Sequence, residues 1–368
     1  MHIICDQKKL MKSITTVLKG ISNKSTMPVL EGIYMEAKDN QVKFIATDLE
    51  LGIETTIETQ VIEEGVMVLN ARLLNEITRK LPGSQVEMRI KENGKVFIKC
   101  EQSEFDLVSY ETEEYPELPK VEKDQISKIP RGLLKNMIEQ TTFAVSQDES
   151  RLILTGGLLE IEDTTLSMVA LDGYRLALRK GEIKGSQDHK VVIPGKTLNE
   201  VGRIIDEDLE EDLQILFTDS HILFDLGKTK VISRLLEGQF IDYKQILPDE
   251  HRVAVEVSRQ SLLHSIERAS LLAKEGNNRL VKFKIEDHQL HISSNSEHGQ
   301  VHEQIGIDQK GDDLEIAFNA KYLIDALKVI EEDEVKLLFT SNVSPGIITS
   351  TENDHYTYLV LPVRLSNS

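Results

Sequence analysis

The segment from Leu69 to Gly83 has the pattern of hydrophobic and polar positions that is typical of a short amphipathic helix. Asn70 is a favourable N-cap residue, and Pro82-Gly83 ends the pattern, so the spacing predicts a helix over residues 70–81. Apolar residues recur on one face at helical spacing, which predicts that this face is buried. These residues are Leu73, Leu74, Ile77 and Leu81.

The same helical pattern occurs twice more, at "PGKTLNEVGRII" from Pro194 and "NAKYLIDALKVI" from Asn319, which are 124 and a further 125 residues along the chain. Each copy follows a long region in which apolar and polar residues alternate, and a strand-like run comes after it. Such alternation favours antiparallel strands with one solvated face. An earlier helical pattern precedes each region, starting near Asp6, Pro130 and Ser258. The chain therefore repeats a unit of helix, strands, helix and strands three times.

The repeat length of about 120 residues is that of a domain and is too long for a solenoid. Polar, proline-bearing segments at Thr112–Gln125 and Ile246–Arg252 separate the copies. We therefore predict an α+β protein of three domains, at residues 1–120, 121–248 and 249–368.

Charge changes this picture, because 62 acidic and 43 basic residues give a net charge of -19, which argues against nucleic acid binding unless the bases are concentrated. In each repeat the second helix carries two bases seven residues apart, opposite its apolar face. These are Arg72 and Arg79, Lys196 and Arg203, and Lys321 and Lys328. The first helices add further bases: Lys8, Lys12, Lys19, Arg131, Lys135, Arg259 and Arg268. The six helical segments together carry +10 and leave -29 for the remainder, which predicts one positive surface if the repeats align them. The alternative is that these faces are simply solvated.

Other chemistry is sparse in this sequence. There is no Gly-rich phosphate loop, no recognisable Ser/Cys-His-acid set and no zinc-ligand spacing, so we expect no catalytic residues, no metal and no cofactor. Cys5 and Cys100 lie in apolar runs and are predicted to be buried free thiols. Asp48 and Asp172 occupy equivalent places after a strand and are predicted to order turns. The first residues lack a signal-peptide layout and no apolar run is long enough to span a membrane, which predicts a cytoplasmic protein.

Four motifs, together with the triple repeat, resemble the bacterial DNA polymerase III β subunit family, the sliding clamps, over the whole chain. They are "TMPVLEGI", "ALDGYRLAL", "GQFIDYKQILP" and "YLVLPVRL". The resemblance implies a ring-shaped head-to-tail homodimer in which two helices per domain, packed on antiparallel sheets, line the central hole. It also implies a non-enzymatic processivity factor in the cytoplasm, associated with the nucleoid, that slides on duplex DNA without sequence preference.

The resemblance implies several partners besides double-stranded DNA and a second copy of the chain. They are the replicative polymerase α subunit, the clamp loader, and other polymerases and repair proteins that carry clamp-binding peptides; no membrane is involved. With the helix pattern, it assigns DNA contact to Lys12, Lys24, Arg72, Arg79, Gln147, Arg151, Lys196, Arg203, Lys321 and Lys328.

The resemblance also implies a peptide groove between the central and C-terminal domains and a joint between subunits. The groove residues would be Arg151, Leu154, Leu171, Gly173, Tyr174, Arg175, Leu176, Ile241, Ile246, Asn319, Tyr322, Pro345, Leu359, Leu361, Pro362, Val363 and Arg364. The joint would contain Phe105, Leu107, Leu271 and Leu272. Leu171, Ile241 and Glu104 depart from the residues that are frequent in the family, so pocket shape and flanking ion pairs are expected to differ here.

Two other classes of function remain open on the residues alone. One is an enzyme with an unrecognised carboxylate site, and the other is an acidic scaffold that does not bind DNA. Clustering of the basic residues on one surface distinguishes a clamp from such a scaffold.

Overall fold

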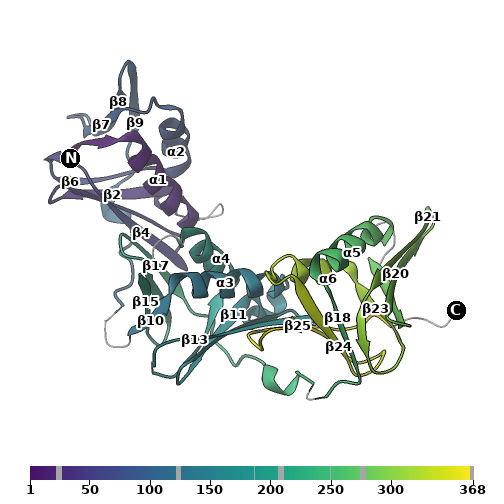
Figure 1. Ribbon diagram of the computed structural model, residues 1–368. Helices are drawn as coiled ribbons and strands as arrows, with labels where there is room; N and C mark the ends of the chain where they lie inside the picture. Colours follow the sequence, from purple (N-terminus) through teal and green to yellow (C-terminus); the bar gives the residue numbers. More distant parts are fainter. Residues whose placement is uncertain are drawn as a thin grey trace. The chain divides into compact units, whose positions relative to one another are not determined.

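The computed structural model (Figure 1) describes most of the chain. The described residues are 1–21, 27–121, 126–185, 187–205, 211–248, 250–273 and 279–364. They form two compact units, one of Met1–Arg131 with Arg203–Leu235 and the other of Gly132–Gly202 with Leu236–Ser368. Within the described ranges, none of the helices has the length and apolar character needed to cross a membrane.

The described residues contain six α-helices, where the periodicity predicts them. Asp6 caps the first by accepting from the amides of Lys8 and Lys9, and Asn70 caps the second by accepting from Leu73 N at 3.0 Å. The helices are α1 Gln7–Val17, α2 Ala71–Lys80, α3 Arg131–Thr141, α4 Gly195–Ile204, α5 Arg259–Ala273 and α6 Ala320–Leu327. The prediction of a buried stripe is wrong for Leu73, which is 45% exposed. The buried residues of α2 are Ala71, Leu74, Ile77 and Thr78.

The first unit contains two antiparallel sheets. The five-stranded sheet has the order β5-β1-β7-β8-β9, with β5 Gln60–Glu63, β1 His2–Asp6, β7 Gln85–Ile90, β8 Lys95–Cys100 and β9 Ser103–Val108. The eight-stranded sheet has the order β10-β15-β16-β17-β4-β3-β2-β6, with β10 Ile126–Pro130, β15 Asp212–Phe217, β16 His221–Asp225, β17 Thr229–Arg234, β4 Leu51–Glu58, β3 Gln41–Thr47, β2 Gly32–Lys38 and β6 Gly65–Asn70.

The second unit also contains two antiparallel sheets. The nine-stranded sheet has the order β14-β11-β12-β13-β26-β25-β24-β18-β22, with β14 His189–Pro194, β11 Gly156–Glu162, β12 Thr165–Leu171, β13 Arg175–Glu182, β26 Tyr356–Val360, β25 Gly346–Ser350, β24 Glu334–Phe339, β18 Val253–Ser258 and β22 Asp308–Lys310. The four-stranded sheet has the order β21-β20-β19-β23, with β21 Gly299–Gly306, β20 Gln289–Ser296, β19 Leu280–Glu286 and β23 Leu314–Asn319.

The strand pairings confirm the threefold repeat. In every repeat, the strand before the first helix pairs with the strand that follows the second helix: β1 with β7, β10 with β15, and β18 with β24. The strand before the second helix pairs with the first strand after the first helix: β6 with β2, β14 with β11, and β23 with β19. The three repeats therefore share one topology of two helices and two sets of strands.

Sheets continue from one repeat into the next at two places. Strand β4 of the first repeat pairs with β17 of the second, where Ile53 lies opposite Val231. Strand β13 of the second repeat pairs with β26 of the third, where Ala177 lies opposite Tyr358. The corresponding strand of the third repeat is β21 and that of the first is β9, and both are terminal strands of their sheets. The series of three repeats thus leaves two terminal strands, β21 and β9, which correspond to the two partners of each inter-repeat pairing.

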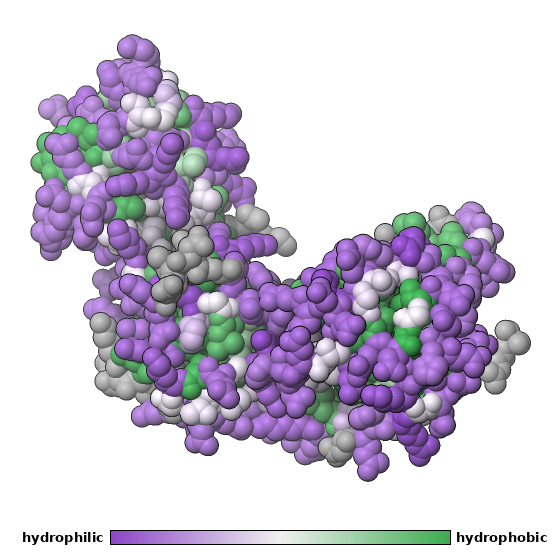
Figure 2. Space-filling view, in the orientation of Figure 1, coloured by the Kyte–Doolittle hydropathy of each residue, from purple (hydrophilic) through white to green (hydrophobic). Residues whose placement is uncertain are grey.

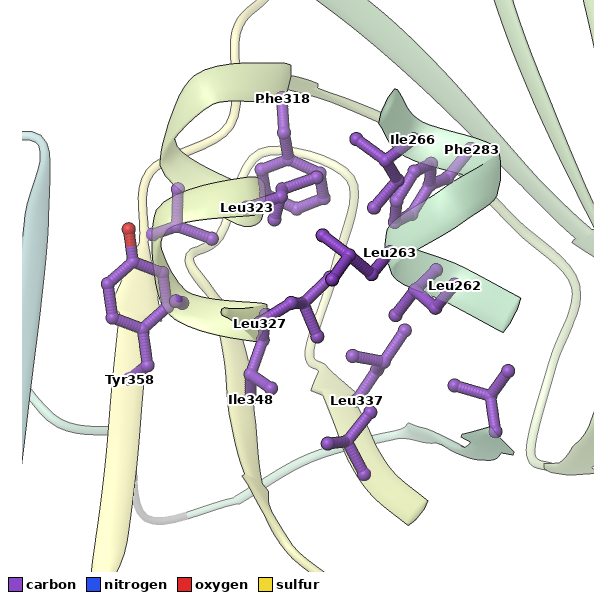
Figure 3. Packing of buried hydrophobic residues seen from close by; sticks show 14 of the residues in the cluster. Leu262, Leu263, Ile266, Phe283, Phe318, Leu323, Leu327, Leu337, Ile348 and Tyr358 are labelled. Carbon is purple, nitrogen blue, oxygen red and sulfur yellow. The ribbon is translucent and has the colours of Figure 1, made fainter. Parts of the chain in front are cut away.

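The core of the third repeat shows how the helices are held on the sheets (Figure 3). Helix α5 contributes Leu262 and Ile266, and α6 contributes Leu323 and Leu327, to a cluster that includes a Phe283–Phe318 ring pair with centroids 5.8 Å apart. Each fully buried side chain of this size contributes about 1.5–3 kcal/mol. The apolar faces of α5 and α6 are therefore committed to the sheets, and their opposite faces remain for solvent or a ligand.

The first residue of the first helix plays one structural role in all three repeats. Gln7 Nε2 donates to the Thr78 carbonyl at 2.6 Å, Arg131 Nε to the Glu211 carbonyl at 2.9 Å, and Arg259 Nη1 to the Leu327 carbonyl at 3.3 Å. Arg131 also donates to Leu226, and Arg259 to Glu332. The prediction that Arg131 and Arg259 belong to exposed basic faces is wrong, because their guanidinium groups are engaged by backbone carbonyls.

Replacing Arg131 by Met should destabilise the protein by about 1–3 kcal/mol, because the Glu211 and Leu226 carbonyls lose a donor while the apolar stem is kept. Urea unfolding of Arg131→Met measures this free energy. The matched control is Lys128→Met on the exposed side of β10, which should change it by no more than about 0.5 kcal/mol. Equal stability of both variants would contradict the structural role.

Candidate functional site

The basic residues of the second helices lie on exposed faces, as predicted. Exposed positions are held by the first-repeat bases Lys12, Arg72 and Arg79 and by Lys196, Arg203, Lys321 and Lys328. In the view of Figure 2, hydrophilic residues cover most of the visible surface. Helices α1 and α2 are neighbours, since Thr15 Oγ1 of α1 contacts Asn75 Oδ1 of α2 at 3.5 Å. The first unit therefore carries bases on two adjacent helices.

Acidic neighbours partly offset the bases of the third repeat. Lys321 forms an ion pair with Asp325, four residues along α6, and Lys328 with Glu267 of α5 at 2.9 Å. Arg268, which was predicted to belong to the basic face of its helix, forms an ion pair with Glu303 of β21. Phosphates would have to compete with these carboxylates. Gln147 and Arg151 are exposed, and Lys24 lies outside the described residues.

The second candidate site lies in the second unit, where β13 and β26 pair side by side. Leu176 lies opposite Leu359, and the chain beyond β26 is held by two backbone bonds. Leu361 N donates to the Tyr174 carbonyl at 2.9 Å, and Val363 N donates to the Ala317 carbonyl at 2.8 Å. The C-terminal motif and the "DGYRLA" motif are therefore brought together, although they are far apart in the sequence.

Arg175 is the polar centre of this junction. Its Nε donates to Asp172 at 3.0 Å, Nη1 to Asp325 at 2.7 Å and Nη2 to the Phe143 carbonyl at 2.8 Å, and its guanidinium lies 4.5 Å from the Tyr322 ring centroid. Burial alone would lower the pKa of Arg175, but Tyr358, Asp325 and Asp172 outweigh it and raise the pKa. With only 7% exposure, Arg175 positions the junction, and few of its atoms remain for a peptide.

Four of the leucines assigned to the groove are core residues in this structure. They have exposures of 2–3% and pack in one cluster with Val169, Phe240 and Ile347. These leucines are Leu154, Leu171, Leu176 and Leu359. Their place in the groove therefore stays a prediction, in which these side chains would form the floor beneath the exposed residues.

The exposed apolar residues of the same region are Tyr174, Ile241, Ile246 and Leu361. Tyr174 stacks on Tyr322 with ring centroids 6.4 Å apart, so the rings of these two tyrosines form one wall. Gly173 has φ +94, and a Cβ there would lie 3.6 Å from Nη1 of Arg151, which brings Arg151 to the same edge. Pro345, Pro362, Val363 and Asn319 are half-buried and Arg364 is exposed. Asn319 also caps α6.

Sequence reasoning missed how the loop that carries Ile241 and Ile246 is anchored. Phe240, Tyr243 and Leu247 pack on the leucine cluster, and Tyr243 Oη donates to the buried Glu160 at 2.8 Å. Lys190 and Lys244 add ion pairs to Glu160 at 2.9 and 3.4 Å. Burial alone would raise the pKa of Glu160, but hydrogen bonds from Lys190 and Tyr243 outweigh it and lower the pKa. The spacing of Phe240, Tyr243 and Leu247 was the available signal.

The predictions for two aspartates and two cysteines are confirmed. Asp48 accepts from the amides of Glu50 and Leu51, and Asp172 accepts from Tyr174 and Arg175, so both order turns. Cys5 and Cys100 are buried free thiols, and burial, with Asp6 nearby, raises the pKa of Cys5 to about 12. The described part of the chain holds no group of three or more His, Cys, Asp or Glu placed to bind a metal.

The candidate joint residues lie at the ends of the repeat series. Phe105 and Leu107 are half-buried on the terminal strand β9, and Leu272 is half-buried in the last turn of α5. Leu271 beside it is 63% exposed.

Comparison with known proteins agrees with this architecture. Residues 1–119, 128–242 and 244–364 match the N-terminal, central and C-terminal domains of the DNA polymerase III beta subunit. The beta sliding clamp of Bacillus subtilis is 38% identical over 99% of this chain and 100% of its own length, and that of Staphylococcus epidermidis is 38% identical over 96% and 97%.

Solved structures agree with the sequence comparison. The sliding clamp of Bacillus subtilis superimposes with a TM-score of 0.96 at 37% identity, covering 100% of both chains. A sliding clamp of Pseudomonas aeruginosa bound to griselimycin gives 0.94 at 28% identity, covering 99% of this chain and 100% of that one.

Three repeats of two helices on antiparallel sheets, with exposed bases on the helices, define a clamp that serves a DNA polymerase. The chain belongs to the DNA polymerase III beta subunit family, the bacterial sliding clamps. Members of this family are non-catalytic processivity subunits that act with DNA and polymerase and self-assemble. This membership decides against the enzyme and the DNA-free scaffold that the residues alone left open.

Glu160 should make stability depend on pH. Its pKa is lowered on folding, so its interactions stabilise the protein above the ordinary glutamate value of 4.5 and are lost as the pH falls below it. Glu160→Gln should cost about 1–2 kcal/mol at neutral pH and much less near pH 3. Thermal denaturation from pH 3 to pH 7 measures the stability of Glu160→Gln and of wild type. Glu162→Gln, at the exposed neighbouring residue, is the control. A constant difference between Glu160→Gln and wild type would contradict the assignment.

Proposed function

We propose that two copies of the chain close a head-to-tail ring around duplex DNA, with α1 to α6 lining the hole. The domain boundaries proposed from the sequence, 1–120, 121–248 and 249–368, would give three domains per subunit. In this ring the protein slides without sequence preference and tethers the replicative polymerase α subunit. This function would place the protein in the cytoplasm at the nucleoid.

The observation that carries the ring is the pair of matching sheet edges. Strands β4 and β13 each pair with a strand of the next repeat, whereas β21, the third strand of this series, is terminal. Its complement in the series is β9, which is also terminal. A second copy supplies that complement, and two such joints close a ring with C2 symmetry. In the same series, Phe105 corresponds to Tyr358 and Leu107 to Val360, which are buried where β13 meets β26.

The α5 side of the joint follows from the same correspondence. Ile129 and Val257 occupy the same register position before their helices, which makes Phe143 the equivalent of Leu271. Phe143 packs against Tyr358 with ring centroids 5.8 Å apart. Leu271 of one subunit would pack against the partner's Phe105 in the same way, with Leu272 in place of Ala144. This supports the joint of Phe105, Leu107, Leu271 and Leu272.

DNA contact in this proposal comes from many exposed bases, each directed at phosphates. They are Lys12, Arg72, Arg79, Lys196, Arg203, Lys321 and Lys328, and the resemblance to the family adds Lys24, Gln147 and Arg151. Phosphate contacts are independent of sequence and weak enough, at about 10⁻⁴–10⁻⁶ M, to permit sliding. The acidic outer strands repel DNA elsewhere, so the ring holds its substrate by enclosure.

Replacing one of these basic residues should therefore weaken binding equally to DNA of any sequence. Arg203→Ala should remove about one phosphate contact and reduce the slope of log K against log salt by about one unit at most. Fluorescence anisotropy with short duplexes of two different sequences measures this slope, and Lys95→Ala on β8 is the control. A sequence-dependent effect, or complete loss of binding from this single change, would contradict a sliding contact.

The second part of the proposal is a docking groove for clamp-binding peptides at the junction of β13 and β26. The exposed side chains of Tyr174, Ile241, Ile246 and Leu361 supply an apolar surface with Tyr322, and the buried leucines support it. Two apolar anchors of a peptide would gain about 3–6 kcal/mol by burial. Ordering of the peptide opposes part of this, so we expect micromolar affinity. The clamp loader, other polymerases and repair proteins would compete for the groove.

Deleting residues 361–368 should abolish peptide and polymerase binding while the ring persists. The deletion must begin at Leu361, because Leu359 and Val360 belong to β26 and are buried. Isothermal titration with a peptide bearing a Gln followed by a Leu-Phe pair measures the affinity, and sedimentation confirms the dimer. Asp354→Ala in the preceding turn is the control. Unchanged affinity in a dimeric truncated protein would refute the groove.

A further inference from the structure

One carboxylate of α6 is shared between two cations that belong to different candidate sites. Asp325 Oδ2 accepts from Arg175 Nη1 at 2.7 Å and also from Lys321 Nζ. The side-chain exposures are 7% for Arg175, 23% for Asp325 and 50% for Lys321, so the three groups run from the buried junction of β13 and β26 to the exposed face of α6. Arg175 belongs to the candidate groove, whereas Lys321 is one of the basic residues that the proposed ring directs at DNA.

The guanidinium of Arg175 supports one wall of the candidate groove. It lies 4.5 Å from the ring centroid of Tyr322, and Tyr322 stacks on the exposed Tyr174. The strength with which Asp325 holds Arg175 therefore acts on the position of these two rings.

Charge makes the two bonds of Asp325 compete with each other. The cations of Arg175 and Lys321 face two carboxylates, since Asp172 also accepts from Arg175 at 3.0 Å. The group is therefore neutral while Lys321 is paired with Asp325. A phosphate that engages the ammonium of Lys321 removes this pairing, and the carboxylate of Asp325 then interacts with Arg175 alone.

The first junction between repeats lacks this arrangement. The second helix of every repeat has a basic residue followed four residues later by an acidic one, namely Arg72 and Glu76, Lys196 and Glu200, and Lys321 and Asp325. In the turn before β4, however, Asp48 accepts from the amide of Leu51, just as Asp172 accepts from that of Arg175 before β13. Leu51 thus stands where Arg175 stands, so the shared carboxylate is a feature of the junction that carries the candidate groove.

We propose that Asp325 is a positioning residue that couples DNA contact to peptide docking. When a phosphate engages Lys321, Asp325 holds Arg175 more strongly, and the wall of Tyr174 and Tyr322 binds a peptide more tightly. The proposal rests on the DNA contact and the peptide groove of the proposed function and adds a link between them. Because such coupling is reciprocal, a bound peptide strengthens DNA binding by the same factor.

The test measures the affinity of the full-length protein for a peptide with and without duplex DNA. The peptide carries a Gln followed by a Leu-Phe pair, has blocked ends and no charged side chain, and is titrated by fluorescence anisotropy alone and with saturating blunt-ended duplex. The duplex should lower the Kd of wild type for the peptide about threefold, which is the size expected when a partly exposed ion pair is exchanged. Lys321→Met should show the tighter affinity without DNA and should not respond to duplex. Asp325→Asn still offers an oxygen to Arg175, so it should bind the peptide but should not respond to duplex.

Lys328→Met is the matched control, because Lys328 pairs with Glu267 of α5 and not with Asp325. This variant should bind duplex more weakly, yet it should keep both the peptide affinity of wild type and the response to saturating duplex. If wild type binds duplex and its peptide affinity does not change, the inference is overturned and the proposed function stands. The same holds if Lys321→Met and Lys328→Met have equal peptide affinities without DNA. A wild type that fails to bind either duplex or peptide would overturn the proposed function and this inference with it.

Discussion

Antiparallel pairing between the edge strands of successive repeats is the constraint on which the other features of this protein depend. An exposed strand edge carries a row of unpaired amides and carbonyls, and natural proteins pair or protect it. Here β4 pairs with β17 and β13 with β26, so a strand of each of the first two repeats covers an edge strand of the following repeat. The series leaves one edge of each type, β21 and β9, and a second copy is the simplest complement for both. The proposed peptide groove would depend on the same pairing, because the Leu361 amide donates to the Tyr174 carbonyl just beyond the place where β13 and β26 meet.

The distribution of charge differs between the two faces of each second helix. The chain carries -19 in total, but its second helices present bases on the face opposite the core. Ion pairs such as Lys328–Glu267 limit the attraction of any one helix, and exposed pairs of this kind add little stability. Weak, distributed attraction is what a sliding ring requires, because strong phosphate contacts would arrest it. Retention can then come from closure of the ring.

Much of the fold could be predicted from the sequence, because helix caps and apolar periodicity are local signals. All six predicted helices are present, and so is the threefold order of helices and strands. The failures have non-local causes. Arg131 and Arg259 were predicted to lie on exposed basic faces, yet their acceptors Glu211 and Glu332 lie 80 and 73 residues away. Likewise, a helical stripe does not distinguish a core leucine from one at a surface, which is why Leu73 was misassigned.

The groove itself stays a prediction, but the burial of its assigned residues is now known. Periodicity alone could not separate the buried Leu171 and Leu359 from the exposed Tyr174 and Leu361. The Glu160–Tyr243 bond joins residues 83 apart, so the spacing of Phe240, Tyr243 and Leu247 could indicate a packed loop but not its polar partner. Such contacts fix where the binding residues stand, and they emerge only when the sheet is assembled.

Enclosure of DNA is the central claim, and retention on circular against linear DNA tests it most directly. The protein would be loaded with a clamp loader onto a nicked circular plasmid, separated from free protein by gel filtration, and then treated with an enzyme that cuts the plasmid once. The account predicts that the clamp stays with the circle and is lost from the linear product, at the same salt concentration. Equal retention on both forms would contradict enclosure and would mean that the protein holds DNA by affinity alone.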